Sequence, residues 1–180
     1  MSNFLVDRRN IILAETENLI YERYNIVCDG TNCFDTGFAP FSSGNINKDF
    51  KISIRLSSFT STGNSNQDAI VACKYEDGAL NGLNWPGFTI RKKSNGATTL
   101  EVGGNNYWTP TVSSVLNKHL YIWRTSGNYY GQIEGGTQQT LNVRSTTFDH
   151  HILIGATQNA NGTKMRNSKG NIDYIKIEYM

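Results

Sequence analysis

The chain has 180 residues and a formal net charge of +2, from 17 basic and 15 acidic side chains. This length suits one domain with a sizeable core. The near balance of basic and acidic side chains argues against a protein that binds nucleic acid chiefly through phosphates. No run approaches the roughly 18 apolar residues of a membrane span, so we expect no membrane insertion. The 17 glycines, 3 prolines and many asparagines predict a soluble all-β domain with tight turns.

The first 22 residues differ from the rest of the chain. Residues 10–21 fit two helical turns or an extended arm, and the segment is either a first strand with a frayed terminus or an arm that docks on a partner. Charged side chains lie within residues 1–10, where an export signal needs an apolar stretch, so we expect no such signal.

Alternating apolar and polar side chains predict most strands. In residues 49–58 the apolar positions follow a period of two, which places one face in the core and one in water. On the strand 119–124, Tyr121 and Trp123 share one face, and we expect core packing to explain that aromatic face. The remaining predicted strands are 69–75, 88–91, 98–102, 129–134, 152–156 and 171–179. Short strands at this spacing predict a sandwich or a barrel.

Five segments, taken in order, resemble the laminin-G-like and concanavalin-A-like jelly rolls. They are residues 24–37, 49–54, 120–136, 152–155 and 170–177. The resemblance covers about residues 24 to 179 and implies a two-sheet antiparallel jelly-roll sandwich. We therefore divide the chain into an arm at residues 1–22 and a domain at residues 23–180, and we expect residues 24–180 to fold without the arm.

The same jelly roll also hosts glycosidases, which need two carboxyl groups close together on one face. Asp173 and Glu178 share the last predicted strand but are five residues apart, so we expect them on opposite faces. No predicted strand carries a same-face acidic pair, and we predict that the protein is not an enzyme. The pair His150-His151 is best explained as a solvated strand edge.

One loop offers oxygen ligands at alternate positions, from Asn64, Asn66 and Asp68. A Ca²⁺ ion accepts such ligands, but a single carboxylate favours an ordinary polar loop. We therefore predict no cofactor and leave calcium open as the one candidate. Cys28 and Cys73 lie in apolar runs and are predicted to be buried thiols.

Aromatic residues in loops rich in glycine and asparagine are the best candidates for a sugar site, because a sugar stacks on an exposed ring and its hydroxyls bond to amides. The candidate glycan-binding residues are Asn84, Trp85, Asn105, Asn106, Tyr107 and Trp108. The alternative is that these rings close the ends of the sandwich.

Domains of the kind that this chain resembles occur on secreted bacterial enzymes, adhesins and phage structural proteins. We expect a phage virion protein (tail fibre, receptor-binding, capsid decoration or head fibre) that binds host-surface glycans. It would assemble in the bacterial cytoplasm, join other virion proteins through residues 1–22 and form a homo-oligomer. The alternatives are a virion protein that binds only proteins, or a carbohydrate-binding module cut from a larger secreted bacterial protein, extracellular or at the cell surface.

Overall fold

The computed structural model describes residues 18–60, 68–76, 78–92, 98–104, 106–159, 161, 163–165 and 167–180. The strands in these ranges are β1 (Leu19–Asp29), β2 (Phe34–Asp35), β3 (Phe50–Thr60), β4 (Ala69–Lys74), β5 (Ala79–Leu80), β6 (Leu83–Asn84), β7 (Gly87–Lys92), β8 (Leu100–Gly103), β9 (His119–Thr125), β10 (Asn128–Ile133), β11 (Gln139–Leu141), β12 (Leu153–Ile154), β13 (Thr157–Gln158), β14 (Lys164–Met165) and β15 (Lys169–Tyr179). Within the described ranges the only helix is the short α2 (Val112–Val115).

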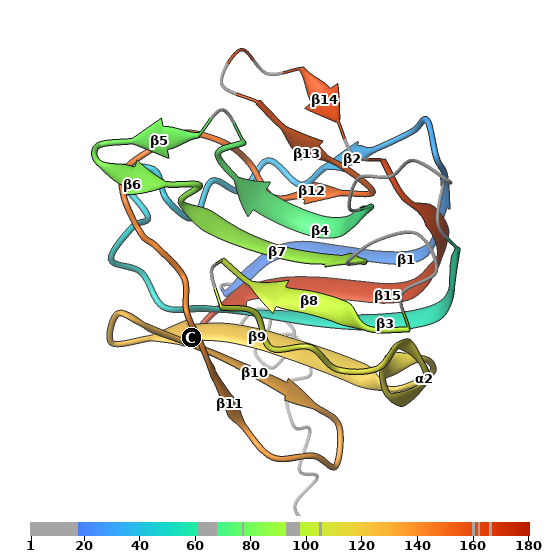
Figure 1. Ribbon diagram of the computed structural model, residues 1–180. Coiled ribbons are helices and arrows are strands. Elements are labelled where there is room, and N and C mark those ends of the chain that lie inside the picture. The colour runs from blue at the N-terminus through green and yellow to red at the C-terminus, as the bar shows by residue number, and fades with distance from the viewer. Residues whose placement is uncertain are drawn as a thin grey trace, which may run out of the picture.

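The strands form two antiparallel sheets that pack face to face (Figure 1). The six-stranded sheet has the order β1-β15-β3-β9-β10-β11, and the five-stranded sheet has the order β2-β12-β4-β7-β8. Two small hairpins, β5-β6 and β13-β14, project from the five-stranded side. The predicted antiparallel sandwich is confirmed.

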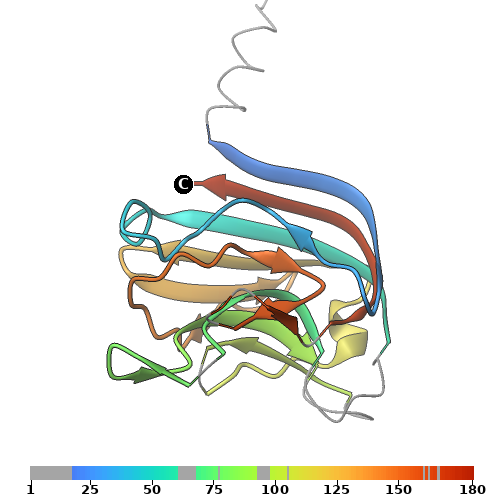
Figure 2. The ribbon, with the colours of Figure 1, turned by 90° about the horizontal axis from the view of Figure 1, so that it is seen from above.

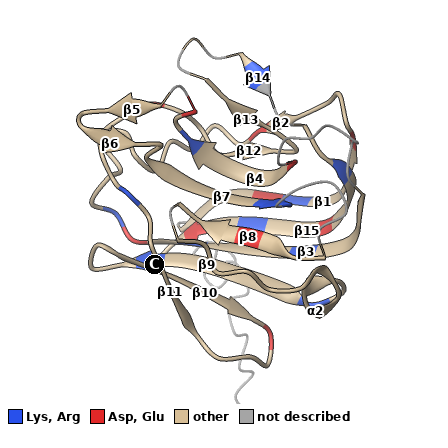
Figure 3. Cartoon of the chain, in the orientation of Figure 1, with Lys and Arg blue, Asp and Glu red and all other residues tan. Residues whose placement is uncertain are grey.

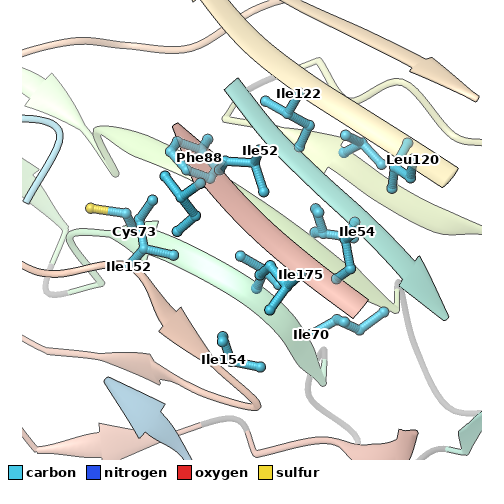
Figure 4. Close-up of a cluster of buried hydrophobic side chains, with 14 of the residues drawn as sticks. Ile52, Ile54, Ile70, Cys73, Phe88, Leu120, Ile122, Ile152, Ile154 and Ile175 are labelled. Atoms are coloured by element: carbon cyan, nitrogen blue, oxygen red, sulfur yellow. The ribbon is translucent and has the colours of Figure 1, made fainter. Parts of the chain in front are cut away.

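The core lies between the two sheets and is built from the alternating positions that the sequence showed. Ile52 and Ile54 of β3 are fully buried, and so are Leu120 and Ile122 of the neighbouring β9. Figure 4 shows these side chains facing residues of the five-stranded sheet such as Phe88. Burial of this apolar surface is the main stabilising contribution of the fold.

Strand β1 lies at the edge of the six-stranded sheet beside β15 (Figure 2). Its register with β15 runs from Leu19 opposite Glu178 to Asp29 opposite Lys169. The strand therefore begins within the segment that we assigned to the arm, while residues 1–17 lie outside the described residues. The prediction that residues 24–180 fold alone stays a prediction.

A β-bulge in the last strand, β15, changes the face of the sheet to which its side chains point. The register of β15 with β3 shifts between Ile172 and Tyr174, so the simple alternation is interrupted there. As a result Asp173 forms an ion pair with Arg55 on the outer face, and Glu178 pairs with Lys176 on the same face. The expectation that Asp173 and Glu178 lie on opposite faces was wrong, because the bulge adds one residue to β15. The two carboxylates are still five residues apart, or about 16 Å along a strand, too far for a glycosidase pair.

The two cysteines predicted to be buried thiols are buried, and neither forms a disulfide. Cys28 and Cys73 are at most 4% exposed. Burial raises the pKa of Cys28 to about 11 and raises that of Cys73 well above its usual value. Both are therefore neutral near pH 7 and behave as small apolar side chains. In the part of the chain that the structure describes, no helix has the length and apolar character to cross a bilayer.

Candidate functional site

The outer face of the five-stranded sheet carries a cluster of charged side chains on adjacent strands. Lys74 ends β4, Arg91 lies on β7, and Glu101 lies opposite Arg91 on β8. All three are at most 7% exposed. Tyr107, from the loop after β8, lies against them. We call Lys74, Arg91, Glu101 and Tyr107 the cationic cluster.

Hydrogen bonds hold the cationic cluster together. Nε of Arg91 donates to a carboxylate oxygen of Glu101 at 2.8 Å. Nζ of Lys74 and Nη2 of Arg91 both donate to the hydroxyl oxygen of Tyr107, each at 2.8 Å. The two cations also lie over the Tyr107 ring, at 5.4 Å and 4.6 Å from its centre. Two buried cationic donors thus converge on one oxygen atom, which is the arrangement that binds a carboxylate.

A further polar atom belongs to the same face. The Oγ1 of Thr89 is buried and has no hydrogen-bond partner in the structure. Thr89 lies two residues before Arg91 on β7, and its neighbours across the sheet are Ala72 and Gly103. A buried hydroxyl without a partner is costly, and Thr89 is 0% exposed, so a polar group lies covered on this face of the sheet.

The loop that carries Trp85 borders this face. Trp85 is 48% exposed and has a φ of 48°, and its backbone N–H donates to the carbonyl oxygen of Gly78. The exposed Asn84 accepts a hydrogen bond from Arg144 through its backbone oxygen. A Cβ on Gly104 would come within 2.4 Å of the Gly87 oxygen, so the start of β7, which follows Trp85, adjoins the end of β8, which precedes Tyr107.

Tyr107 and Trp108 point to different sides of the five-stranded sheet. The Tyr107 hydroxyl meets the two cations of the cluster, whereas the Trp108 ring packs against the core and lies beside Gly131 of the other sheet. Backbone hydrogen bonds in both directions between Trp108 and Val102 fix this alternation. Of the predicted sugar residues, Tyr107 lies in the cluster and Trp85 is exposed nearby. Trp108 packs against the core.

The other predicted site residues are less informative. Asn106 is exposed and has a φ of 48°, while Asn105 lies outside the described residues. Asp68 is 2% exposed, and its backbone oxygen accepts a hydrogen bond from Lys92, while Asn64 and Asn66 also lie outside the described residues. Among the residues that the structure places, no three side chains of His, Cys, Asp or Glu are grouped as metal ligands.

The outer face of the six-stranded sheet was misjudged from the sequence. Leu120 and Ile122 of β9 fill the core, so Tyr121 and Trp123 point outward, and core packing does not explain them. His119 lies on the same side, two residues before Tyr121. We call His119, Tyr121 and Trp123 the aromatic stripe. The alternation itself predicted that one pair faces outward, but it did not say which.

Two hollows lie on this face. One, of about 210 Å³, is lined by Lys51, Tyr121, Trp123, Gln132 and Met180. The other, of about 410 Å³, is lined by Tyr24, Arg55, His119, Asp173 and Tyr174. The aromatic stripe contributes to both hollows and joins them.

Comparison with known proteins supports the fold. No protein-family model and no curated protein matches the chain. Among solved structures, the sialidase CBM40 of Ruminococcus gnavus bound to α2,6-sialyllactose is 14% identical with a TM-score of 0.56, over 88% of this chain and 92% of that one. The same module bound to α2,3-sialyllactose gives 14% and 0.55, over 88% and 91%.

A leech intramolecular trans-sialidase also matches, with 14% identity and a TM-score of 0.51 over 89% of this chain and 26% of that one. At such identity the likeness shows a shared lectin-like β-sandwich. The resemblance drawn from the sequence is thus confirmed at the level of a jelly-roll-like sandwich.

Proposed function

We propose that this chain is a non-catalytic glycan-binding module that recognises a sugar bearing a carboxylate. The observation that carries the proposal is the convergence of Lys74 and Arg91 on the hydroxyl oxygen of Tyr107, each at 2.8 Å. A carboxylate oxygen in that position would receive the same two charge-assisted hydrogen bonds. The likeness to modules whose structures hold sialyllactose, an acidic sugar, supports this choice of ligand class.

Binding at this site requires Tyr107 to give way. Its loop lies beside that of Trp85, so an arriving sugar would displace the phenol and meet an exposed indole ring. The ring supplies a stacking surface, and the cations supply selectivity for the acid. Glu101 holds Arg91 in place and is left as a positioning residue.

A titration with sialyllactose and with lactose tests the proposal, because the two ligands differ in the acidic sugar. We expect the wild-type chain to bind sialyllactose more tightly than lactose. Lys74→Gln should weaken binding about tenfold, the equivalent of one lost charge-assisted hydrogen bond. The control Lys51→Gln changes a lysine on the other sheet and should leave binding unchanged. Equal affinity for lactose, or none for either sugar, would contradict the proposal.

The biological setting is also a proposal. The virion protein joined to its assembly through residues 1–22 remains one setting, and a module of a larger secreted protein is the other. The fold likeness to a sialidase module along 92% of that module's length supports the second setting at least as well. Mass spectrometry of purified phage particles from the source strain would detect the chain only in the first setting.

A further inference from the structure

We propose that the outer face of the six-stranded sheet is a second glycan surface, which binds a neutral sugar chain along the aromatic stripe. This inference does not depend on the acidic-sugar site, since the two lie on opposite outer faces of the sandwich. It begins from the register of the sheet. Trp123 is opposite Lys51 and Tyr130, Tyr121 is opposite Ser53 and Gln132, and His119 is opposite Arg55.

The ring contacts on this face fall into two groups. Trp123 stacks with Tyr130 at 5.6 Å, and Tyr121 lies parallel to His119 at 5.8 Å. His119 then meets Tyr174 edge-on at 5.8 Å, and Tyr174 meets Tyr24 at 5.0 Å. Tyr121 and Trp123 line the smaller hollow together, so the two groups lie along one face from β10 to β1 and reach both hollows. A sugar chain could follow such a path with one unit at each hollow, because every pyranose offers an apolar face to a ring.

The charges on the face fit a neutral ligand. Arg55 is 3.9 Å from Asp173, Lys176 pairs with Glu178, and the ammonium of Lys51 lies 4.7 Å from the centre of the Tyr121 ring. Each cation thus has a partner on the same face. An acidic polymer would have to compete with Asp173 for Arg55 and with Glu178 for Lys176. Figure 3 likewise shows basic and acidic residues interspersed along the strands.

The polar composition also distinguishes this face from a protein interface. The centre of a protein interface is depleted in charged residues, whereas Lys51 and Arg55 lie beside the stripe and Ser53 lies between them. Gln132 adds an amide in the smaller hollow. Hydroxyl-rich ligands use such groups together with rings, so a neutral glycan suits the face better than a second copy of the chain or residues 1–17.

Affinity electrophoresis of the full chain in gels that contain soluble neutral polysaccharides tests the inference. The probes are mannan, mixed-linkage glucan, arabinan and galactan, with polysialic acid as the acidic comparison. We expect at least one neutral polymer to retard the wild-type chain. Trp123→Ala and Tyr24→Ala, one at each hollow, should each weaken that binding about tenfold, which corresponds to a lost aromatic contact. Tyr24 is 60% exposed, so its variant should fold normally.

Lys74→Gln is the matched control, since it alters only the cationic cluster and should leave retardation by the neutral polymer unchanged. Three results would overturn the inference: no retardation by any neutral polymer, unchanged retardation of both aromatic variants, or a dimer in sedimentation that Tyr24→Ala converts to monomer. If neutral binding is present and sialyllactose binding is absent, this inference stands and the acidic-sugar proposal fails. If sialyllactose binds and no neutral polymer does, only this inference is rejected and the acidic-sugar proposal stands.

Discussion

The charged side chains of the cationic cluster, on the outer face of the five-stranded sheet, are buried, whereas those on the outer face of the six-stranded sheet remain at the surface. The side chains of Arg91 and Glu101 are 7% and 9% exposed, but those of Arg55 and Asp173 are 44% and 39% exposed. The Tyr107 side chain lies over the charges of the cationic cluster, and the other face carries two open hollows. The same antiparallel scaffold thus supports one enclosed ionic site and one open aromatic surface.

The largest effect that tests this difference is the loss of a carboxylate from each face. We expect Glu101→Ala to lower the free energy of unfolding by about 3–5 kcal/mol, because it leaves the Arg91 charge buried beside Lys74 without its carboxylate. Asp173→Ala should cost at most about 1 kcal/mol, because water already screens that pair. Urea unfolding of both variants measures the two values. Equal losses would show that the two faces are solvated alike.

A second comparison separates the two tryptophans that the sequence placed together. Trp108 packs between the sheets, so Trp108→Ala should lower the free energy of unfolding by about 3 kcal/mol. Trp85 is 48% exposed, and Trp85→Ala should change stability by less than about 1 kcal/mol while weakening sialyllactose binding. Thermal melts and the sugar titration report these effects. A large loss of stability in both variants would remove Trp85 as a binding residue.

The fold was predictable because its strands follow simple alternation. Residues 49–58 were predicted as a strand, and all but the first lie within β3, while residues 171–179 lie within β15. The bulge between Ile172 and Tyr174 left one sign in the sequence, because the apolar Ile172 and Ile175 are three residues apart and so break the period of two. It moved Asp173 to the outer face beside Arg55.

The candidate site was only partly predictable. The sequence placed Tyr107 in a polar loop, but Lys74, Arg91 and Glu101 come from three strands that only the sheet order brings together. For the aromatic stripe, alternation left two assignments for β9, and burial of Leu120 and Ile122 decided between them.

A smaller effect concerns the contact between the sheets. A Cβ on Gly131 would lie 3.0 Å from Cζ3 of Trp108 and 3.3 Å from Cδ1 of Leu141. Gly131→Ala should therefore destabilise the protein by about 1 kcal/mol through crowding. In the Trp108→Ala background the same change should be neutral or stabilising, because the ring is gone. Additive losses in this double-mutant cycle would place the Trp108 ring away from Gly131.

The smallest effect lies on the open face and depends on pH. Desolvation, followed by the charge of Glu22, raises the pKa of Tyr174 to about 12 from an ordinary value of 10.0. The unfolded chain therefore loses this proton at a lower pH than the folded chain does. The resulting contribution to stability is complete below pH 10 and is lost as the pH rises from about 10 through about 12.

Tyr174→Phe should make the fall in unfolding free energy shallower in that window and leave it unchanged near neutral pH. Urea unfolding at about pH 8 and about pH 11 measures the difference. Trp123→Phe is the control, since it alters the same face without removing a titratable group. An equal alkaline loss in wild type and Tyr174→Phe would mean that water reaches this hydroxyl freely, and that the larger hollow is more open than the packing of Tyr174 against Tyr24 and His119 indicates.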